Sequence, residues 1–268
     1  ILVENTFIHS AIDGAKIRLR IYKRKSPSAP TPVLLWLHGG GYIMGSPEQD
    51  DGVCIQYVRE LGIQVVSVDY RLAPKFPFPV GLEDGYTTLQ WIAKHAPALG
   101  MDENRIAIGG ASAGGGLAAS LIQLTCDRQE IKPSFQILVY PMLDDRTVFR
   151  PKIENIDHIA WNQKSNRFGW GSYLGTNFGS EVVPEYAVPA RRADLPGLPP
   201  AWIGVGSIDL FYDEDLAYAQ RLLESGVQCE QYTVSGAFHG FDVFGSQLPV
   251  VQEFRRSQMA ALKQHLSL

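Results

Sequence analysis

The heptapeptide GGASAGG, residues 109–115, places a single serine among four glycines and two alanines. It contains the pattern G-x-S-x-G around Ser112 and lies between an apolar run, RIAIGG (105–110), and a segment with helical spacing, 114–128. A nucleophile elbow needs this arrangement, because its serine occupies a strained strand-to-helix turn in which only small neighbours fit. A glycine-rich turn that merely ends a strand is the alternative, so other motifs must decide.

Short apolar runs alternate along the chain with segments of helical spacing. Continuous apolar runs are typical of strands covered on both faces, whereas AKIRLRIYKR (15–24) alternates apolar with basic residues and predicts a strand near a sheet edge. The predicted central strands are 33–37, 64–70, 105–110, 135–140 and 201–206, with a further strand at 230–234, and the predicted helices are 50–61, 82–95, 114–128, 214–225 and 250–266. This alternation predicts the α/β class, with a mostly parallel sheet and helices on both faces.

One long connection, 144–199, interrupts the alternation. It is rich in proline and carries the aromatic residues Trp161, Phe168, Trp170, Tyr173 and Phe178. Connections of this length are uncommon as plain loops, and the aromatic residues favour a cap or lid inserted into the domain. A long surface connection is the alternative. We therefore expect residues 1–268 to form one domain with a cap insertion at about 144–199 and a short N-terminal contribution to the cap.

Two further residues have the types and chain order that a serine nucleophile requires. A serine hydroxyl needs a base to take its proton and a third group to orient that base. Asp209 follows the predicted strand 201–206, and His239 lies in the glycine-flanked sequence GAFHGF after the predicted strand 230–234. Taken alone, Asp209 is equally well explained as the N-cap of a helix beside the acidic turn 213–215, and His239 is equally well explained as a histidine without a catalytic role. Their joint order of Ser, Asp, His favours a catalytic triad.

The sequence LHGGGYIMG (37–45) directly follows the predicted strand 33–37 and predicts an oxyanion hole. Acyl transfer builds negative charge on the substrate oxygen, and backbone N–H groups aimed at that oxygen stabilise it. We assign these donors to Gly40, Gly41 and Ala113, and expect His38 to orient the glycine loop through hydrogen bonds. A flexible glycine loop is the alternative. A nucleotide-binding loop is excluded, because neither G-x-G-x-x-G nor G-K-[ST] follows.

Composition and charge narrow the possible partners. The chain has 24 basic and 28 acidic residues, and its net charge of −4 does not favour binding to nucleic acid or anionic membranes. Its three cysteines, at positions 54, 126 and 229, form no CxxC pair and are read as free thiols of a reducing compartment. No apolar run approaches the roughly 20 residues that span a bilayer. We therefore expect a cytoplasmic protein without a membrane span, metal or organic cofactor.

Five motifs together resemble the hormone-sensitive-lipase-like branch of the α/β-hydrolases, a family of carboxylesterases. In chain order they are HGGGY (38–42), DYRLAPKFPFPVGLEDGY (69–86), GASAGG (110–115), DLFYDE (209–214) and HGF (239–241). The resemblance implies the triad Ser112, Asp209 and His239 and the oxyanion donors already assigned. This chain departs from the family at Ala111, where aspartate is usual, and in the short stretch of 37 residues before His38, which starts at Ile1 rather than Met.

The residues and the resemblance together predict a carboxylesterase that works through an acyl-enzyme. The resemblance implies short-chain acyl esters as substrates, and a monomer or homodimer as the assembly. An amidase or formamidase with the same triad is the second enzyme reading. A small-molecule receptor that has lost turnover is the reading from a different class, and the presence of all three triad residues weighs against it.

Overall fold

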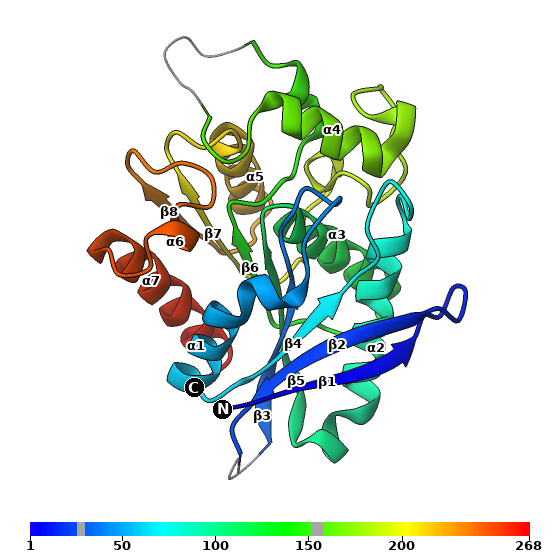
Figure 1. Cartoon of the computed structure of the whole chain (residues 1–268), viewed down its shortest axis with the longest axis vertical. Coiled ribbons are helices and arrows are strands. Elements are labelled where there is room, and N and C mark those ends of the chain that lie inside the picture. Colours follow the sequence, from blue (N-terminus) through cyan, green and yellow to red (C-terminus); the bar gives the residue numbers. More distant parts are fainter. Residues whose placement is uncertain (26–29, 152–157) are drawn as a thin grey trace.

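A mixed sheet runs through the protein, whose computed structural model describes residues 1–25, 30–151 and 158–268. Eight strands of this described part form the sheet in the order β1-β2-β4-β3-β5-β6-β7-β8 (Figure 1). Their bounds are β1 (Leu2–His9), β2 (Lys16–Lys23), β3 (Thr31–Leu37), β4 (Gln64–Asp69), β5 (Met101–Ala111), β6 (Phe135–Val139), β7 (Ala201–Gly206) and β8 (Cys229–Val234). The strands from β4 to β8 are parallel, and β1 and β2 join this sheet as an antiparallel pair.

Helices cover both faces of the sheet and divide the core into two layers (Figure 1). The helices are α1 (Asp51–Leu61), α2 (Val80–Leu99), α3 (Ala113–Arg128), α4 (Gln163–Leu174), α5 (Tyr212–Glu224), α6 (Phe241–Phe244) and α7 (Pro249–His265). Strand β3 shows how one strand serves both layers, because alternate side chains of a strand point to opposite faces. Val33 and Leu35 belong to the core layer that includes residues of α2, α3 and α5, whereas Leu34 and Trp36 belong to the layer that includes residues of α1 and α7.

The α/β class and the mostly parallel sheet are confirmed, and the main departure from prediction is strand β1. Its sequence, LVENTFIH, contains no continuous apolar run, and most of its residues are exposed because it forms the edge of the sheet. It pairs with β2 over its whole length, from Leu2 opposite Lys23 to His9 opposite Lys16. The strand predicted at 15–24 therefore lies second from the edge, shielded on one side by β1.

The connection from β6 to β7 contains α4 and packs on the loop that follows β3. Residues 152–157 of the predicted cap fall outside the described residues. On α4, the rings of Trp170 and Tyr173 lie 5.3 and 4.1 Å from the ring of Tyr42, measured between centroids. Trp170 and Tyr173 are buried, but Phe168 is exposed. Aromatic packing thus holds α4 against the loop that carries the HGGGY sequence.

Candidate active site

Ser112 lies at the sharp turn between β5 and α3. Its backbone has φ 56° and ψ −121°, a conformation that is costly for a residue with a side chain and that is expected of a nucleophile elbow. The flanking glycines are required by close approach of the helix to the sheet. A methyl group on Gly114 would lie 2.0 Å from the carbonyl oxygen of Leu37, and one on Gly110 would lie 2.4 Å from the carbonyl oxygen of Gly114. The glycines of GGASAGG therefore provide the space for this turn.

The side chains of Ser112, His239 and Asp209 form a continuous chain of hydrogen bonds. His239 Nε2 lies 2.8 Å from Ser112 Oγ, and His239 Nδ1 lies 2.8 Å from Asp209 Oδ2. All three are buried, with exposed fractions of 7% for Ser112, 4% for Asp209 and 7% for His239. Because a carboxylate can only accept, Nδ1 donates to Asp209, which leaves Nε2 free to accept the serine proton.

The fold brings these three residues together because each follows the carboxyl end of a parallel strand. Ser112 follows β5, Asp209 follows β7 and His239 follows β8, and these strands belong to one sheet. Asp209 is held by a second contact, since its Oδ1 accepts the backbone N–H of Phe211 at 2.9 Å. One carboxylate oxygen is thus fixed by the backbone while the other faces the imidazole.

Two aromatic rings pack edge-on against the imidazole of His239. The ring centroid of Tyr140 lies 4.9 Å away and that of Phe211 lies 5.1 Å away, with interplanar angles of 67° and 89°. Tyr140 is itself fixed, because its hydroxyl donates to Asp242 Oδ1 at 2.7 Å. The imidazole is therefore restrained by packing on its sides as well as by hydrogen bonds at both nitrogens.

The glycine loop after β3 presents backbone N–H groups beside the elbow. Gly40 and Gly41 have φ values of 122° and 60°, and no described residue accepts a hydrogen bond from their N–H groups. Ala113, the first residue of α3, is fully buried next to Ser112. His38, which we expect to orient the glycine loop, donates from Nδ1 to the carbonyl oxygen of Gly39 at 2.8 Å, and burial lowers its pKa.

Replacing Gly41 with alanine is expected to lower kcat for a short ester by about 10²-fold with a smaller change in KM, because an oxyanion donor is displaced. The new methyl group would lie 2.0 Å from Cη2 of Trp161, at a backbone position with φ 60°. Steady-state kinetics with p-nitrophenyl acetate measure the effect. Gly52→Ala is the matched control, because nothing lies within 4 Å of its added methyl group. Equal kcat values for the two variants would contradict the role assigned to Gly41.

Glu214 is a buried polar residue that the sequence reading did not single out. The sequence at 213–215 predicts only the acidic first turn of a helix, yet Glu214 is 2% exposed and Asp215 is completely buried. The signal that could have identified them is the spacing of α5. Its buried residues, at positions 214, 215, 218, 219 and 222, follow one another at intervals of three or four residues around the helix and form one face.

Ala111 borders a cavity of about 650 Å³ between α1 and the α6–α7 region. Asp50, Tyr140 and Asp242 also line this cavity. Asp50 accepts a hydrogen bond from Trp36 Nε1 at 2.7 Å, and burial raises the pKa of its carboxyl to about 7. The small side chain at 111 therefore leaves open space on the side of the sheet where α1 and α7 pack.

The Asp50→Asn variant is expected to be more stable than the wild type at pH 8, and the two should be closer at pH 5. The pKa of Asp50 is raised from 3.8 to about 7 in the folded protein, so its contribution to stability is present below pH 3.8 and is lost as pH rises through about 7. Asparagine stays neutral and can still accept from Trp36. Urea unfolding at both pH values measures the difference. An equal pH dependence of the free energy of unfolding in the wild type and the variant would contradict the raised pKa of a buried Asp50.

Within the ranges 1–25, 30–151 and 158–268, no group of three His, Cys, Asp or Glu side chains is placed to hold a metal ion. No helix in these ranges combines the length and the apolar character needed to cross a membrane.

Comparison with known proteins assigns the chain to a family. The family described as the alpha/beta hydrolase fold matches residues 34–243. The chain is 35% identical over 259 residues to esterase LipI of Mycobacterium tuberculosis, covering 94% of this chain and 80% of the relative. It is 32% identical over 268 residues to an ethyl acetate hydrolase of Pseudomonas putida, covering 95% and 80%.

A solved structure agrees with the sequence relatives. A bacterial heroin esterase superposes with a TM-score of 0.92 at 35% identity, over 99% of this chain and 84% of that one. The sequence and structural matches extend over nearly the whole chain. The chain therefore belongs to the alpha/beta-hydrolase family, in the hormone-sensitive-lipase-like branch that its motifs predicted.

Proposed function

We propose that this chain hydrolyses short-chain carboxylic esters with Ser112 as nucleophile, His239 as general base and Asp209 as the residue that orients the base. Its relatives are esterases, and the chain is a carboxylic-ester hydrolase that acts on small ester substrates. The observation that supports the assignment of residues is the unbroken chain of hydrogen bonds from Ser112 through His239 to Asp209.

In the first half of the reaction, Ser112 Oγ attacks the ester carbonyl while His239 Nε2 takes the serine proton. Asp209 stabilises the imidazolium that forms. The carbonyl oxygen gains negative charge and receives hydrogen bonds from the N–H groups of Gly40, Gly41 and Ala113. When the tetrahedral intermediate collapses, the bond to the alkoxy oxygen breaks, and His239 gives its proton to the leaving alcohol. The acyl group remains on Ser112.

In the second half, water replaces the alcohol. His239 takes a proton from the water as it attacks the acyl carbonyl, and the same backbone donors stabilise the second oxyanion. Collapse of this intermediate breaks the bond to Ser112 Oγ, which recovers its proton from His239 and releases the carboxylic acid. His239 must be neutral at the start of each half, because only a neutral imidazole has a nitrogen that can accept the proton.

The insertion at 144–199 is proposed to act as a cap that limits the length of the acyl chain. Trp161, nearly buried at 9% exposure, packs its indole against Gly41, where a methyl group would lie 2.0 Å from Cη2. The indole N–H donates to Asn166 on α4 at 3.3 Å. Because the large indole ring of Trp161 is held beside Gly41, a proposed oxyanion donor, it leaves little room for a long acyl chain. This supports a preference for acyl groups from acetyl to about hexanoyl.

A series of p-nitrophenyl esters from acetate to palmitate tests this function, together with an amide matched to the best ester. We expect kcat/KM to peak at short chains and the ester to be cleaved faster than its amide. Faster cleavage of the amide would favour an amidase, and a peak at palmitate would contradict the acyl-chain limit. An ester that binds stably and is never cleaved would favour a receptor.

A further inference from the structure

We propose that Glu214 is a positioning residue that fixes the distance between Ser112, the nucleophile, and Asp209, the carboxylate of the triad. The inference rests on the proposed function, since it concerns the geometry of Ser112 and Asp209 in the same reaction. Its basis is a closed circuit of hydrogen bonds and short backbone segments. The circuit passes through the Glu214 carboxyl group and links the elbow to the loop that carries Asp209.

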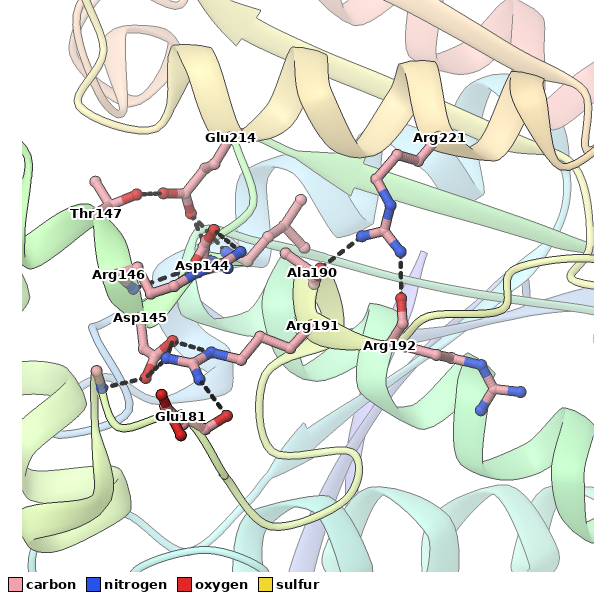
Figure 2. A network of polar contacts seen from close by, with 12 residues as sticks. Asp144, Asp145, Arg146, Thr147, Glu181, Ala190, Arg191, Arg192, Glu214 and Arg221 are labelled. Atoms are coloured by element: carbon pink, nitrogen blue, oxygen red, sulfur yellow. Dashed lines mark hydrogen bonds and ion pairs between the residues drawn. The ribbon is translucent and has the colours of Figure 1, made fainter.

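The Glu214 side chain crosses from α5 to the segment that leaves β6 (Figure 2). Its Oε1 accepts the backbone N–H groups of Leu143 at 2.7 Å and Asp144 at 3.0 Å, and its Oε2 meets the hydroxyl of Thr147. Burial raises the pKa of Glu214 to about 8 even though these three donors act in the opposite direction. A carboxyl group that is costly to bury is thus kept beside backbone donors that have no other described partner.

The segment that Glu214 binds also holds the backbone of Ser112. The N–H of Ser112 donates to the carbonyl oxygen of Val139 at 2.9 Å, and the N–H of Met142 donates to the carbonyl oxygen of Ser112 at 2.9 Å. Leu143 and Asp144 follow Met142 directly. The hydrogen bonds that Glu214 accepts therefore begin one residue beyond the contact that restrains the nucleophile's own carbonyl.

The other end of the circuit is the start of α5. Asp209 Oδ1 accepts from the N–H of Phe211, and the carbonyl oxygen of Asp209 accepts from the N–H of Tyr212 at 3.2 Å. Glu214 lies in the first turn of the same helix. The circuit closes through the contacts of His239 with Asp209 and Ser112, which are both 2.8 Å. Loss of the Glu214 side chain would remove the hydrogen bonds that join α5 to Leu143 and Asp144. In this circuit, those are the side-chain contacts that lie outside the triad.

The return of the insertion to β7 is tied to α5 by a different residue, which provides a control. Arg221, also on α5, donates to the carbonyl oxygens of Ala190 and Arg192 (Figure 2). Nearby, the buried carboxylate of Asp145 pairs with Arg191. Arg221 thus attaches the insertion to α5 and makes no hydrogen bond of its own to residues 139–144, although the N–H of Ala190 donates to the carbonyl oxygen of Leu143 at 3.2 Å. Comparing Glu214 with Arg221 separates positioning of the triad from general attachment of the insertion.

The test compares Glu214→Ala, Glu214→Gln and Arg221→Met with the wild type, using p-nitrophenyl acetate because its acyl group is the smallest. We expect Glu214→Ala to lose about 30-fold or more in kcat with less than a threefold change in KM. Glu214→Gln is expected to keep at least a third of kcat, because its amide oxygen can accept both N–H groups and its NH₂ group can donate to Thr147. Arg221→Met is expected to keep kcat within threefold.

Size-exclusion chromatography and circular dichroism establish that each variant is folded. If Glu214→Ala does not fold, Glu214→Asp replaces it, since its shorter side chain keeps the carboxylate but cannot reach both N–H groups, and it is expected to lose about tenfold in kcat. Unchanged kcat in the folded Ala or Asp variant, or an equal loss in Arg221→Met, would overturn the inference. Absence of turnover by the wild type would instead overturn the proposed function.

Discussion

The Ser112→Ala variant is expected to lose on the order of 10⁵ to 10⁶-fold in kcat for p-nitrophenyl acetate. In the proposed reaction the hydroxyl oxygen, 2.8 Å from His239 Nε2, bonds to the acyl group, and alanine has no atom to replace it. The remaining rate would come from attack by water, helped by the backbone donors of the glycine loop. Steady-state kinetics at pH 8 measure the loss.

Stability is expected to change little in Ser112→Ala, because the serine hydroxyl caps no backbone N–H of α3 and the strained φ of 56° is disfavoured for both residues. Ser120→Ala is the matched control, since Ser120 is a buried serine in the same helix. It should retain full kcat. A Ser112→Ala protein that is folded and keeps a tenth of the wild-type rate would mean that another residue is the nucleophile.

The second large effect is expected for Asp209→Asn, which should lower kcat by about 10⁴-fold while leaving the fold intact. Asp209 Oδ1 accepts the N–H of Phe211, so the oxygen of an asparagine must stay on that side. Its NH₂ group then faces His239 Nδ1, which has to accept instead of donate. The proton of the neutral imidazole moves to Nε2, and the nitrogen that faces Ser112 can no longer take the serine proton.

Kinetics of Asp209→Asn across pH, compared with Asp213→Asn, test this explanation. Asp213 lies in the same acidic stretch, but its side chain is 64% exposed and makes no contact with His239, so its variant should behave as the wild type. Thermal unfolding checks that both variants are folded. A loss in Asp209→Asn of less than tenfold would show that the orientation of His239 does not depend on this carboxylate.

The positions of Ser112 and Asp209 could be predicted because each follows a strand with a strong apolar signal, and His239 follows the strand EQYTV, whose signal is weaker. Parallel strands place their carboxyl ends at one edge of the sheet, so three loops far apart in sequence become neighbours once the strands are recognised. The glycine loop was predictable for the same reason. It directly follows β3, the central run VLLWL, and its glycines are needed where the backbone comes close to Met44 and Trp161.

Other features could not be predicted because their signals depend on tertiary contacts. Strand β1 has most of its side chains exposed, so it lacks the apolar pattern that marks a strand. Glu214 and Asp215 have the sequence of an ordinary acidic helix start, and only the packing of α5 shows that they point inward. Similarly, the raised pKa of Asp50 follows from burial beside a cavity that helices distant in sequence enclose.

The central claim is that Ser112 carries the acyl group during turnover. Its most direct test is the mass of the intact protein after acid quenching during hydrolysis of p-nitrophenyl butyrate, followed by peptide mapping. The account predicts a fraction of chains heavier by one butyryl group, located on the peptide that contains Ser112, and no such fraction in Ser112→Ala. A butyryl group on another residue, or turnover by Ser112→Ala at the wild-type rate, would contradict it.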